Sequence, residues 1–271
     1  MSIHTPVMSL LNNTLSPQAD AIISLIQASL QDILGEKLLG LYLYGSLAAG
    51  DFLEDISDID LFALLSSELD QGEFDRLEKT HLDIVAAQPN WENRIEIAYL
   101  PQAALNSFRT VTSRIAIISP GEPFHFKEAG MDWAINWYIL QRQGRVLFGP
   151  PVEDVFPEIT PQEFISIVRR QAEEWRSYIV NARESTRYQA YAVVTICRAY
   201  YAAATGEQPT KPQAGTWAKA LFPDWADLID WSFDMRVIPD DHVPDPARSY
   251  PKVVAFVNFI LERMAELPYK S

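Results

Sequence analysis

The sequence predicts an α+β protein, with a mixed β-sheet flanked by helices in its N-terminal part and an all-α helical bundle in its C-terminal part. Short apolar segments typical of strands lie before residue 120, and long segments with helical spacing follow residue 160. Between them, Gly149-Pro150-Pro151 opens a proline-rich stretch typical of a domain boundary. A chain of 271 residues is long enough for two domains with separate cores. We therefore expect domains over residues 1–156 and 157–271.

The first predicted elements are a helix and two buried strands. Ser16-Pro17 is typical of a helix start, and apolar residues at helical spacing continue to Gly35, where we expect the helix to end. Residues 38–44 and 59–65 are short, mostly apolar segments and are predicted as strands. Small residues at 45–50 favour a short helix packed closely on the first strand.

Five further segments complete the N-terminal part. We expect a helix over 68–88 and a strand over 94–100, where apolar and polar residues alternate. Another strand is predicted within 109–118. Residues 119–130 contain two prolines and two glycines and are predicted as a loop, and a tryptophan-containing helix is predicted over 131–147.

The C-terminal part has the pattern of a helical bundle. Thr160 and Glu163 form a capping box around a helix start, with Pro161 in the first turn. Helical segments follow at about 161–184, 188–204 and 248–266, and prolines mark a loop over 237–251. Little strand signal appears here, which favours an all-α domain.

Composition and charge exclude several classes of function. The net charge is −14 and the 22 Lys and Arg residues are scattered, so we expect no nucleic-acid binding, while a cationic partner would be attracted. The sole cysteine, Cys197, lies in an apolar segment and is predicted to be a buried thiol. No long apolar run and no signal-peptide pattern are visible, so we expect a cytoplasmic monomer that does not bind membranes.

Two short motifs together predict a metal-assisted phosphate site. Gly45-Ser46 follows a strand and opens a helix, an arrangement that presents backbone N–H groups to an anion. Asp58 and Asp60 are two residues apart at the start of a strand, so both side chains point to one face. Two such carboxylates repel unless a cation lies between them, and Mg²⁺ binds carboxylates together with substrate phosphates.

Glu96 supplies a third carboxylate. It lies between Ile95 and Ile97 in the predicted strand 94–100, where a buried charge is costly without a partner or a role. It could bind metal or accept a proton from an attacking hydroxyl. Gly-Ser or Asp-x-Asp alone is usually a plain turn or a solvated cap, but the ordered set predicts nucleotidyl transfer. The other polar residues of the intervening loop are predicted to be solvated: Asp51, Glu54, Asp55 and Ser57.

This ordered set resembles the active-site motif of the polymerase-beta type nucleotidyltransferase superfamily. The chain is most similar to the streptomycin/spectinomycin (aminoglycoside) adenylyltransferases, over about residues 20–235. The similarity continues in Met131–Pro150 and in Thr195–Trp217. The resemblance implies an antibiotic-resistance transferase that uses Mg²⁺, one ion or two, and ATP to place AMP on a small-molecule hydroxyl.

The resemblance also implies a role for each residue of the set. Asp58 and Asp60 would coordinate Mg²⁺, and Glu96 would join them and act as the general base. The phosphates of ATP would be bound by residues from both domains: Gly45, Ser46, Arg198 and Lys211. Without the resemblance, Arg198 reads as a surface arginine on a helix and Lys211 as a lysine in a loop.

The expected acceptor site departs from the family pattern. Residues 124–128 lack the tryptophan that the family has before the helix at Met131, and Tyr188-Gln189 stands where the family has an acidic pair. Glu184, Tyr188 and Trp175 are the candidate acceptor residues. Three alternatives therefore stay open, namely another small-molecule acceptor, a protein acceptor, and a nucleotide-binding sensor without turnover.

Overall fold

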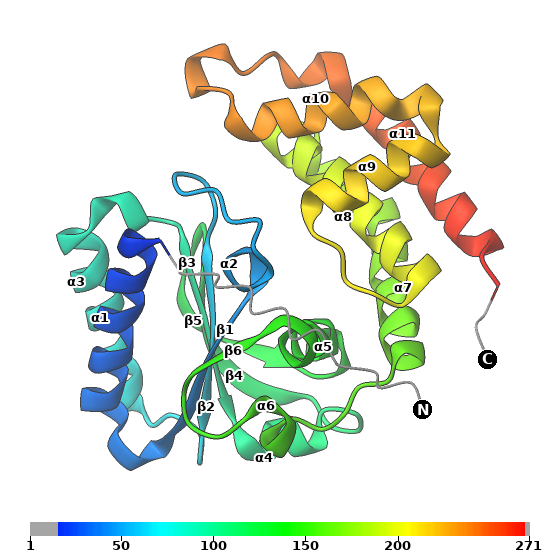
Figure 1. The fold of residues 1–271 in the computed structure, drawn as a ribbon. Helices are drawn as coiled ribbons and strands as arrows, with labels where there is room; N and C mark the ends of the chain where they lie inside the picture. Colours follow the sequence, from blue (N-terminus) through cyan, green and yellow to red (C-terminus); the bar gives the residue numbers. More distant parts are fainter. Residues whose placement is uncertain (1–15, 269–271) are drawn as a thin grey trace, which may run out of the picture.

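The computed structural model describes residues 16–268 and contains one six-stranded mixed sheet beside a helical half (Figure 1). The strand order is β5-β4-β3-β2-β1-β6, in which β2 and β3 are parallel and the other neighbouring pairs are antiparallel. The strands are β1 (Leu38–Tyr44), β2 (Ile59–Leu65), β3 (Ile95–Pro101), β4 (Ser113–Ser119), β5 (Glu122–Ala129) and β6 (Arg145–Phe148).

Helices cover both faces of the sheet, which is why its central strands are almost continuously apolar. Two of these helices, α1 and α3, lie on one face and α5 lies on the other (Figure 1). Ser16 caps the first helix as predicted, since its hydroxyl accepts a hydrogen bond from Ala19 N at 3.1 Å. The helices of this half are α1 (Pro17–Leu34), α2 (Gly45–Ala49), α3 (Gln71–Ala87), α4 (Gln102–Ser107) and α5 (Ala134–Gln143).

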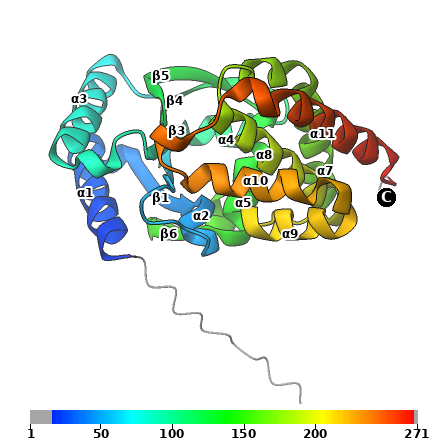
Figure 2. The same ribbon diagram turned by 90° about the horizontal axis from the view of Figure 1, so that it is seen from above.

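The C-terminal half is the predicted bundle, built around α8. Viewed from above, it extends to one side of the sheet, away from α1 and α3 (Figure 2). The capping box of Thr160 and Glu163 is present at the start of α7. The longer helices are α7 (Pro161–Tyr178), α8 (Thr186–Thr205), α9 (Lys211–Leu221), α10 (Ala226–Val237) and α11 (Pro246–Glu266). Within residues 16–268, no helix has the length and apolar character needed to cross a membrane.

Short helical segments join these elements. The four-residue α6 (Val152–Val155) lies between the two halves. Single 3-10 turns occur at Gly35–Lys37, Pro89–Trp91, Met131–Trp133, Ile179–Ala182, Pro223–Trp225 and Asp240–His242.

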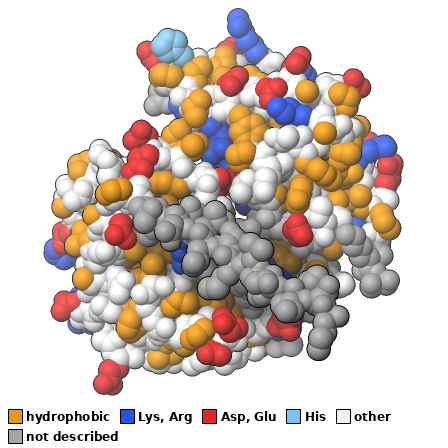
Figure 3. Space-filling view, in the orientation of Figure 1, with side chains coloured by type: hydrophobic (Ala, Val, Ile, Leu, Met, Phe, Trp, Pro, Cys, Tyr) orange, Lys and Arg blue, Asp and Glu red, His pale blue; other side chains and the backbone are white. Residues whose placement is uncertain are grey.

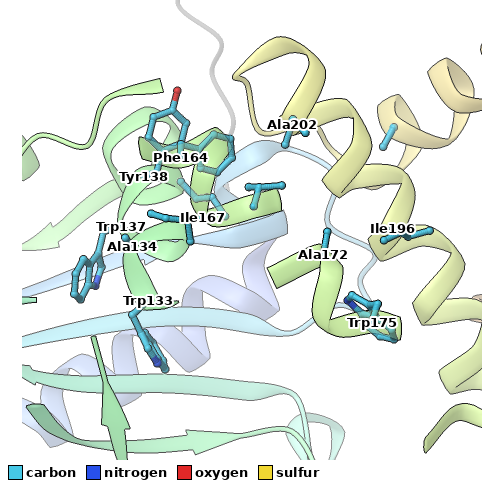
Figure 4. Close-up of a cluster of buried hydrophobic side chains, with 14 of the residues drawn as sticks. Trp133, Ala134, Trp137, Tyr138, Phe164, Ile167, Ala172, Trp175, Ile196 and Ala202 are labelled. Atoms are coloured by element: carbon cyan, nitrogen blue, oxygen red, sulfur yellow. The ribbon is translucent and has the colours of Figure 1, made fainter. Parts of the chain in front are cut away.

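A shared hydrophobic core joins the two halves. Tyr138 of α5 stacks on Phe164 of α7 with ring centroids 4.0 Å apart, and its hydroxyl donates to the carbonyl of Gly206 at 2.8 Å. Figure 4 shows this continuous cluster, which reaches from Trp133 to Ile196. Because a packed core resists displacement, it holds the bundle in one position against the sheet.

The proline-rich connection between the halves is also packed. Phe156 meets Tyr42 of β1 and Phe62 of β2 edge-on, with ring centroids 5.4 and 5.2 Å apart. Val152 and Ile159 are buried on either side of it. The connection therefore anchors the bundle to the sheet.

Two predicted boundaries were wrong. Residues 119–130, predicted as a loop, contain β5, which forms a hairpin with β4 around Pro120-Gly121. Phe124 and Phe126 of this strand stack on Phe74 of α3, and this tertiary packing outweighs the local turn residues. The predicted helix 131–147 ends at Gln143, because Gly144 begins an extended connection to the edge strand β6.

Other predictions were confirmed, and some helices were not predicted. The strands at 38–44 and 59–65 were predicted to the residue, and Cys197 is buried as expected. Burial raises the pKa of its thiol to about 12. The sequence pattern did not indicate four helices, namely α4, α6, α9 and α10.

The buried histidine of α3 generates a prediction about acid stability. His81 Nε2 and the Tyr99 hydroxyl share a hydrogen bond of 2.9 Å, and burial lowers the pKa of His81 from 6.5 to about 4. The unfolded chain therefore binds a proton below pH 6.5 that the folded chain excludes until about pH 4. Stability is full above pH 6.5 and falls by about 3 kcal/mol as the pH approaches 4.

We expect the double variant His81→Leu/Tyr99→Phe to lose stability less steeply between pH 6.5 and 4 than the wild type. Urea unfolding at several pH values measures this slope. His242→Asn, at an exposed histidine, is the control and should keep the wild-type slope. A double variant as acid-sensitive as the wild type would contradict the assignment.

Candidate active site

The strand register brings the predicted carboxylates together. Tyr44 of β1 is paired with Asp60 of β2, and Asp60 is paired with Glu96 of β3. Paired residues on neighbouring strands point to the same face, so these three side chains are neighbours. Asp58 precedes Asp60 by two residues and shares its face.

Burial and the repulsion between neighbouring carboxylates both act on this cluster. The pKa of Asp60 is raised well above its usual range, first by burial and then by the negative charges of Glu96 and Asp58. Burial also raises the pKa of Asp58, although Lys211 opposes the shift. The protein alone therefore disfavours the ionised cluster, and a bound cation would favour it.

Two hydroxyl groups hold Glu96. Tyr44 donates to Oε1 at 2.9 Å, and the Ser119 hydroxyl donates to Oε2 at 3.1 Å. Burial, followed by the charges of Glu96 and Asp60, raises the pKa of Tyr44 well above its usual range, so its hydroxyl keeps the proton it donates. The sequence prediction did not include Tyr44 or Ser119, because only the sheet register shows that they reach Glu96.

Position 45 requires glycine because the backbone there passes close to the Asp60 carboxylate. Its φ is +70°, a region that favours glycine, and a Cβ there would lie 1.8 Å from Asp60 Oδ2. Ser46 follows it, partly exposed, in the first turn of α2. Gly45 thus lies directly against the Asp60 carboxylate.

The bundle presents cations to the carboxylates. Burial lowers the pKa of Arg198, whereas the charges of Asp51 and Asp60 oppose that shift. Its Nε is buried and has no hydrogen-bond partner within the described part of the chain. The pKa of Lys211 is lowered by burial and then by Arg236 and Arg198. Basic side chains are visible on the helical half where it faces the sheet half (Figure 3).

A third cation was not predicted. Arg236 of α10 is partly buried and lies close enough to Asp51 and Asp58 for their charges to raise its pKa against the lowering effect of burial. No local motif surrounds it, and only the position of α10 brings it to the site. Three cations that repel one another form a site suited to a polyanion.

A direct hydrogen bond also links the halves at the site. The backbone N–H of Lys211, in the first turn of α9, donates to Asp51 Oδ2 at 3.2 Å. A carboxylate is favourable at a helix N-terminus. Asp51 was expected to be solvated, and the structure instead gives it this structural contact.

The candidate acceptor residues are separated. Trp175 and Arg198 line one pocket of about 190 Å³ between α5, α7 and α8. Tyr188 packs on Trp175 with ring centroids 6.0 Å apart, and stacks on Tyr191 at 5.8 Å. The Glu184 side chain is 89% exposed and lies 3.8 Å from Arg183, apart from this aromatic group.

The segment 124–128, which lacks the tryptophan of the family, lies away from the carboxylates. Phe124 and Phe126 of β5 pack against α3, in the core between the sheet and α1. The Asp58, Asp60 and Glu96 face is the other face of the sheet, where Tyr44 and Phe62 are buried. These two phenylalanines therefore support the fold on the face away from the carboxylates.

The carboxylates could bind a magnesium ion whose remaining ligands come from the nucleotide. Among residues 16–268, no three His, Cys, Asp or Glu side chains are already placed as a metal cage. Mg²⁺ usually binds one or two carboxylates together with substrate phosphates, so a full protein cage is not required. Asp58 and Asp60 meet that requirement, and a bound cation would oppose the rise in their pKa values that burial causes.

Comparison with protein families covers both halves. The model of the nucleotidyltransferase domain matches residues 26–117, and the model described as aminoglycoside adenylyltransferase, C-terminal domain, matches residues 154–263. The chain belongs to the aminoglycoside adenylyltransferase group of nucleotidyltransferases. The first matched segment contains all three carboxylates, and the second contains the three cations.

Comparison with solved structures finds a protein that has the same fold as this chain. A spectinomycin adenyltransferase from Enterococcus faecialis, solved with ATP and spectinomycin, superposes with a TM-score of 0.72 at 18% identity. The match covers 91% of this chain and 99% of that one. A comparison with the sequences of curated proteins finds no match.

Gly45 allows a direct test of the adenylyltransferase site. We expect Gly45→Ala to reduce nucleotidyl transfer by about 100-fold or more, because the added Cβ displaces the Asp60 carboxylate and small misplacements are costly. Gly121→Ala is the matched control, since Gly121 also has a positive φ but open space around it. Pyrophosphate release measures both variants. Equal activity in the two would contradict a role for this close approach.

Proposed function

We propose that this chain transfers AMP from Mg·ATP to a hydroxyl of a small molecule, with an aminoglycoside or aminocyclitol antibiotic as the first candidate. The observation that carries the proposal is the opposition of two partly buried clusters of unlike charge. Asp58, Asp60 and Glu96 lie on the sheet, and Arg198 and Lys211 face them from the bundle. A metal-bound triphosphate is complementary to both clusters at once.

The carboxylates divide into two roles. Asp58 and Asp60 would hold Mg²⁺ together with Glu96, and the ion would neutralise negative charge on the phosphates. Glu96 accepts the proton of the acceptor hydroxyl, and the hydroxyl oxygen attacks the α-phosphorus as pyrophosphate leaves. Tyr44 and Ser119 orient Glu96 through the hydrogen bonds to its two oxygens.

The phosphate-binding groups come from both halves. Gly45 and Ser46 bring the start of α2 against the phosphates, and Arg198 and Lys211 bind them from the bundle. We assign these groups to a nucleotidyltransferase domain over residues 1–156 and a helical domain over 157–271 that completes the ATP and acceptor sites. Among the residues that the structure describes, the buried Nε of Arg198 has no hydrogen-bond partner, which supports this role, because such a donor is costly unless a ligand satisfies it.

The candidate acceptor rests on similarity and on charge. The related structure from Enterococcus faecialis was solved with spectinomycin, an aminocyclitol. The net charge of −14 would also draw a cationic acceptor toward the protein. A sensor that binds nucleotide without turnover is the alternative, and the three carboxylates of a complete catalytic set favour the enzyme.

Asp60→Asn tests the metal site through activity and stability together. We expect transfer to fall by about 1,000-fold or more, because a metal ligand stabilises developing charge by several kcal/mol. The metal-free variant should melt several degrees higher than the wild type, since the substitution removes a buried charge that its neighbours repel. Its melting temperature should no longer rise with Mg·ATP.

The matched control is Asp55→Asn, at an exposed position in the same loop. It should keep wild-type transfer and wild-type stabilisation by Mg·ATP. Full activity in Asp60→Asn, or unfolding of that variant, would contradict the assigned metal role. Pyrophosphate release and thermal melting curves with and without Mg·ATP provide both measurements.

Arg236 tests the polyanion site. We expect Arg236→Ala to raise the KM for ATP about tenfold or more, because a charge-assisted contact to phosphate is lost from a partly buried site. Arg170→Ala, at an exposed arginine of α7, should leave the KM unchanged. Steady-state kinetics at fixed acceptor concentration separate the two variants. An unchanged KM for ATP in Arg236→Ala would remove this residue from the nucleotide site.

A further inference from the structure

A pocket of about 210 Å³ lies between α3 and the β4–β5 hairpin, on the sheet face that carries α1 and α3 (Figure 1). Its apolar walls include Leu82, Val85, Trp91, Ile95, Ile118 and Phe124. Trp91 and Phe124 belong to the core on this face, whereas the Leu82 side chain of α3 is 67% exposed. The pocket therefore offers apolar surface that a ligand would remove from water.

The size and the walls of the pocket suit one ring. An apolar cavity of about 150 Å³ holds benzene, so this volume accommodates a six-membered ring with a short side chain. Phe124 packs edge-on against His81 and Tyr99, with ring centroids 5.2 and 5.5 Å apart. Because these contacts hold the Phe124 ring in place, this wall is formed before a ligand binds.

The rim of the pocket is acidic. Glu78, Glu92 and Glu122 line it and are exposed, and no lysine or arginine of the described chain does so. Among the described residues, Glu78 and Glu92 form no salt bridge, and Glu122 lies 3.6 Å from His125. His81, which also lines the pocket, is neutral near pH 7 because burial lowers its pKa to about 4. The rim therefore attracts a cation and repels an anion.

The apolar walls and the acidic rim favour the same kind of molecule. Burial of a ring removes apolar surface from water, while an ammonium group attached to it can remain hydrated beside the exposed carboxylates. The ammonium group then avoids the cost of full desolvation. A carboxylate in its place would be repelled by the rim, and a neutral hydroxyl would gain no attraction of charge.

We infer that this pocket is a second ligand site, for a small molecule with one apolar ring and one ammonium group. The inference does not rest on the proposed function, because the groups assigned to Mg²⁺ and ATP do not line this pocket. Ser119 lines it and also donates a hydrogen bond to Glu96 at 3.1 Å, so the pocket borders the active site.

The test is a ligand-observed NMR titration of the full chain at low ionic strength, without metal or nucleotide. The probes are phenethylamine, its neutral isostere phenylethanol, the anion phenylacetate, and ethylamine, which has no ring. We expect phenethylamine to bind at least threefold more tightly than phenylethanol and at least tenfold more tightly than phenylacetate or ethylamine. Equal binding by any of these three would overturn the inference. So would the absence of saturable phenethylamine binding at about 10 mM, since ligands of this size reach millimolar affinity.

A variant at the mouth of the pocket provides a second readout. Leu82→Arg places a cation at an exposed position, one helical turn after Glu78, and should weaken phenethylamine binding at least tenfold while strengthening phenylacetate binding. Leu25→Arg is the matched control, because Leu25 is an exposed leucine on the neighbouring helix α1 and does not line the pocket. It should keep wild-type affinity for both probes. Equal phenethylamine affinity in the two variants would contradict the assigned site.

A titration with Mg²⁺ and a non-hydrolysable ATP analogue separates this inference from the proposed function. Phenethylamine binding that occurs only in the presence of the analogue would place the amine in the acceptor site and would overturn the inference. Phenethylamine binding in a chain that does not bind the analogue would support the second site and contradict the proposed function.

Discussion

Mutual repulsion among buried carboxylates is the constraint on which the rest of this structure depends. Asp60 lies beside Glu96 in the strand register and on the same face as Asp58, and each disfavours the ionisation of Asp60. A fold with three such groups loses stability unless something opposes them. Here the opposing charge comes partly from Arg198 and Lys211 and is completed by a bound cation in the proposed function. The unliganded site therefore lowers the stability of the protein, and the same unbalanced charge favours ligand binding.

Rigid packing keeps the two charged walls in place despite this repulsion. The sheet wall and the bundle wall come from segments far apart in the chain, and no covalent link holds them at a set distance. The aromatic contacts of Tyr138 with Phe164, and of Phe156 with Tyr42, perform that function. Since close-packed interiors deform little, unlike charges can face each other across a cleft without collapsing onto one another. The backbone N–H of Lys211 bridges the walls directly at the site through its hydrogen bond to Asp51.

Local patterns were sufficient for some features and insufficient for others. Strands 38–44 and 59–65 were predicted to the residue because buried strands are apolar and their ends carry strong breakers. Asp58 and Asp60 could be placed on one face because strand periodicity is a local property. β5 was missed because Pro120, Gly121 and Pro123 are local signals of a turn, while the stacking of Phe124 on Phe74 depends on tertiary structure. Tyr44, Ser119 and Arg236 reach the site only through sheet register and helix docking, which a single sequence does not display.

Total charge and local charge lead to different conclusions in this molecule. The value of −14 describes the whole surface, and at physiological ionic strength its field decays over about 8 Å. It can steer an encounter, but contact energies inside the cleft are set by the few groups that line it. Those groups are Arg198, Lys211 and Arg236 on the bundle, opposite carboxylates already engaged with them. An acidic protein can thus have a basic binding wall, and that wall suits the phosphates of the proposed nucleotide.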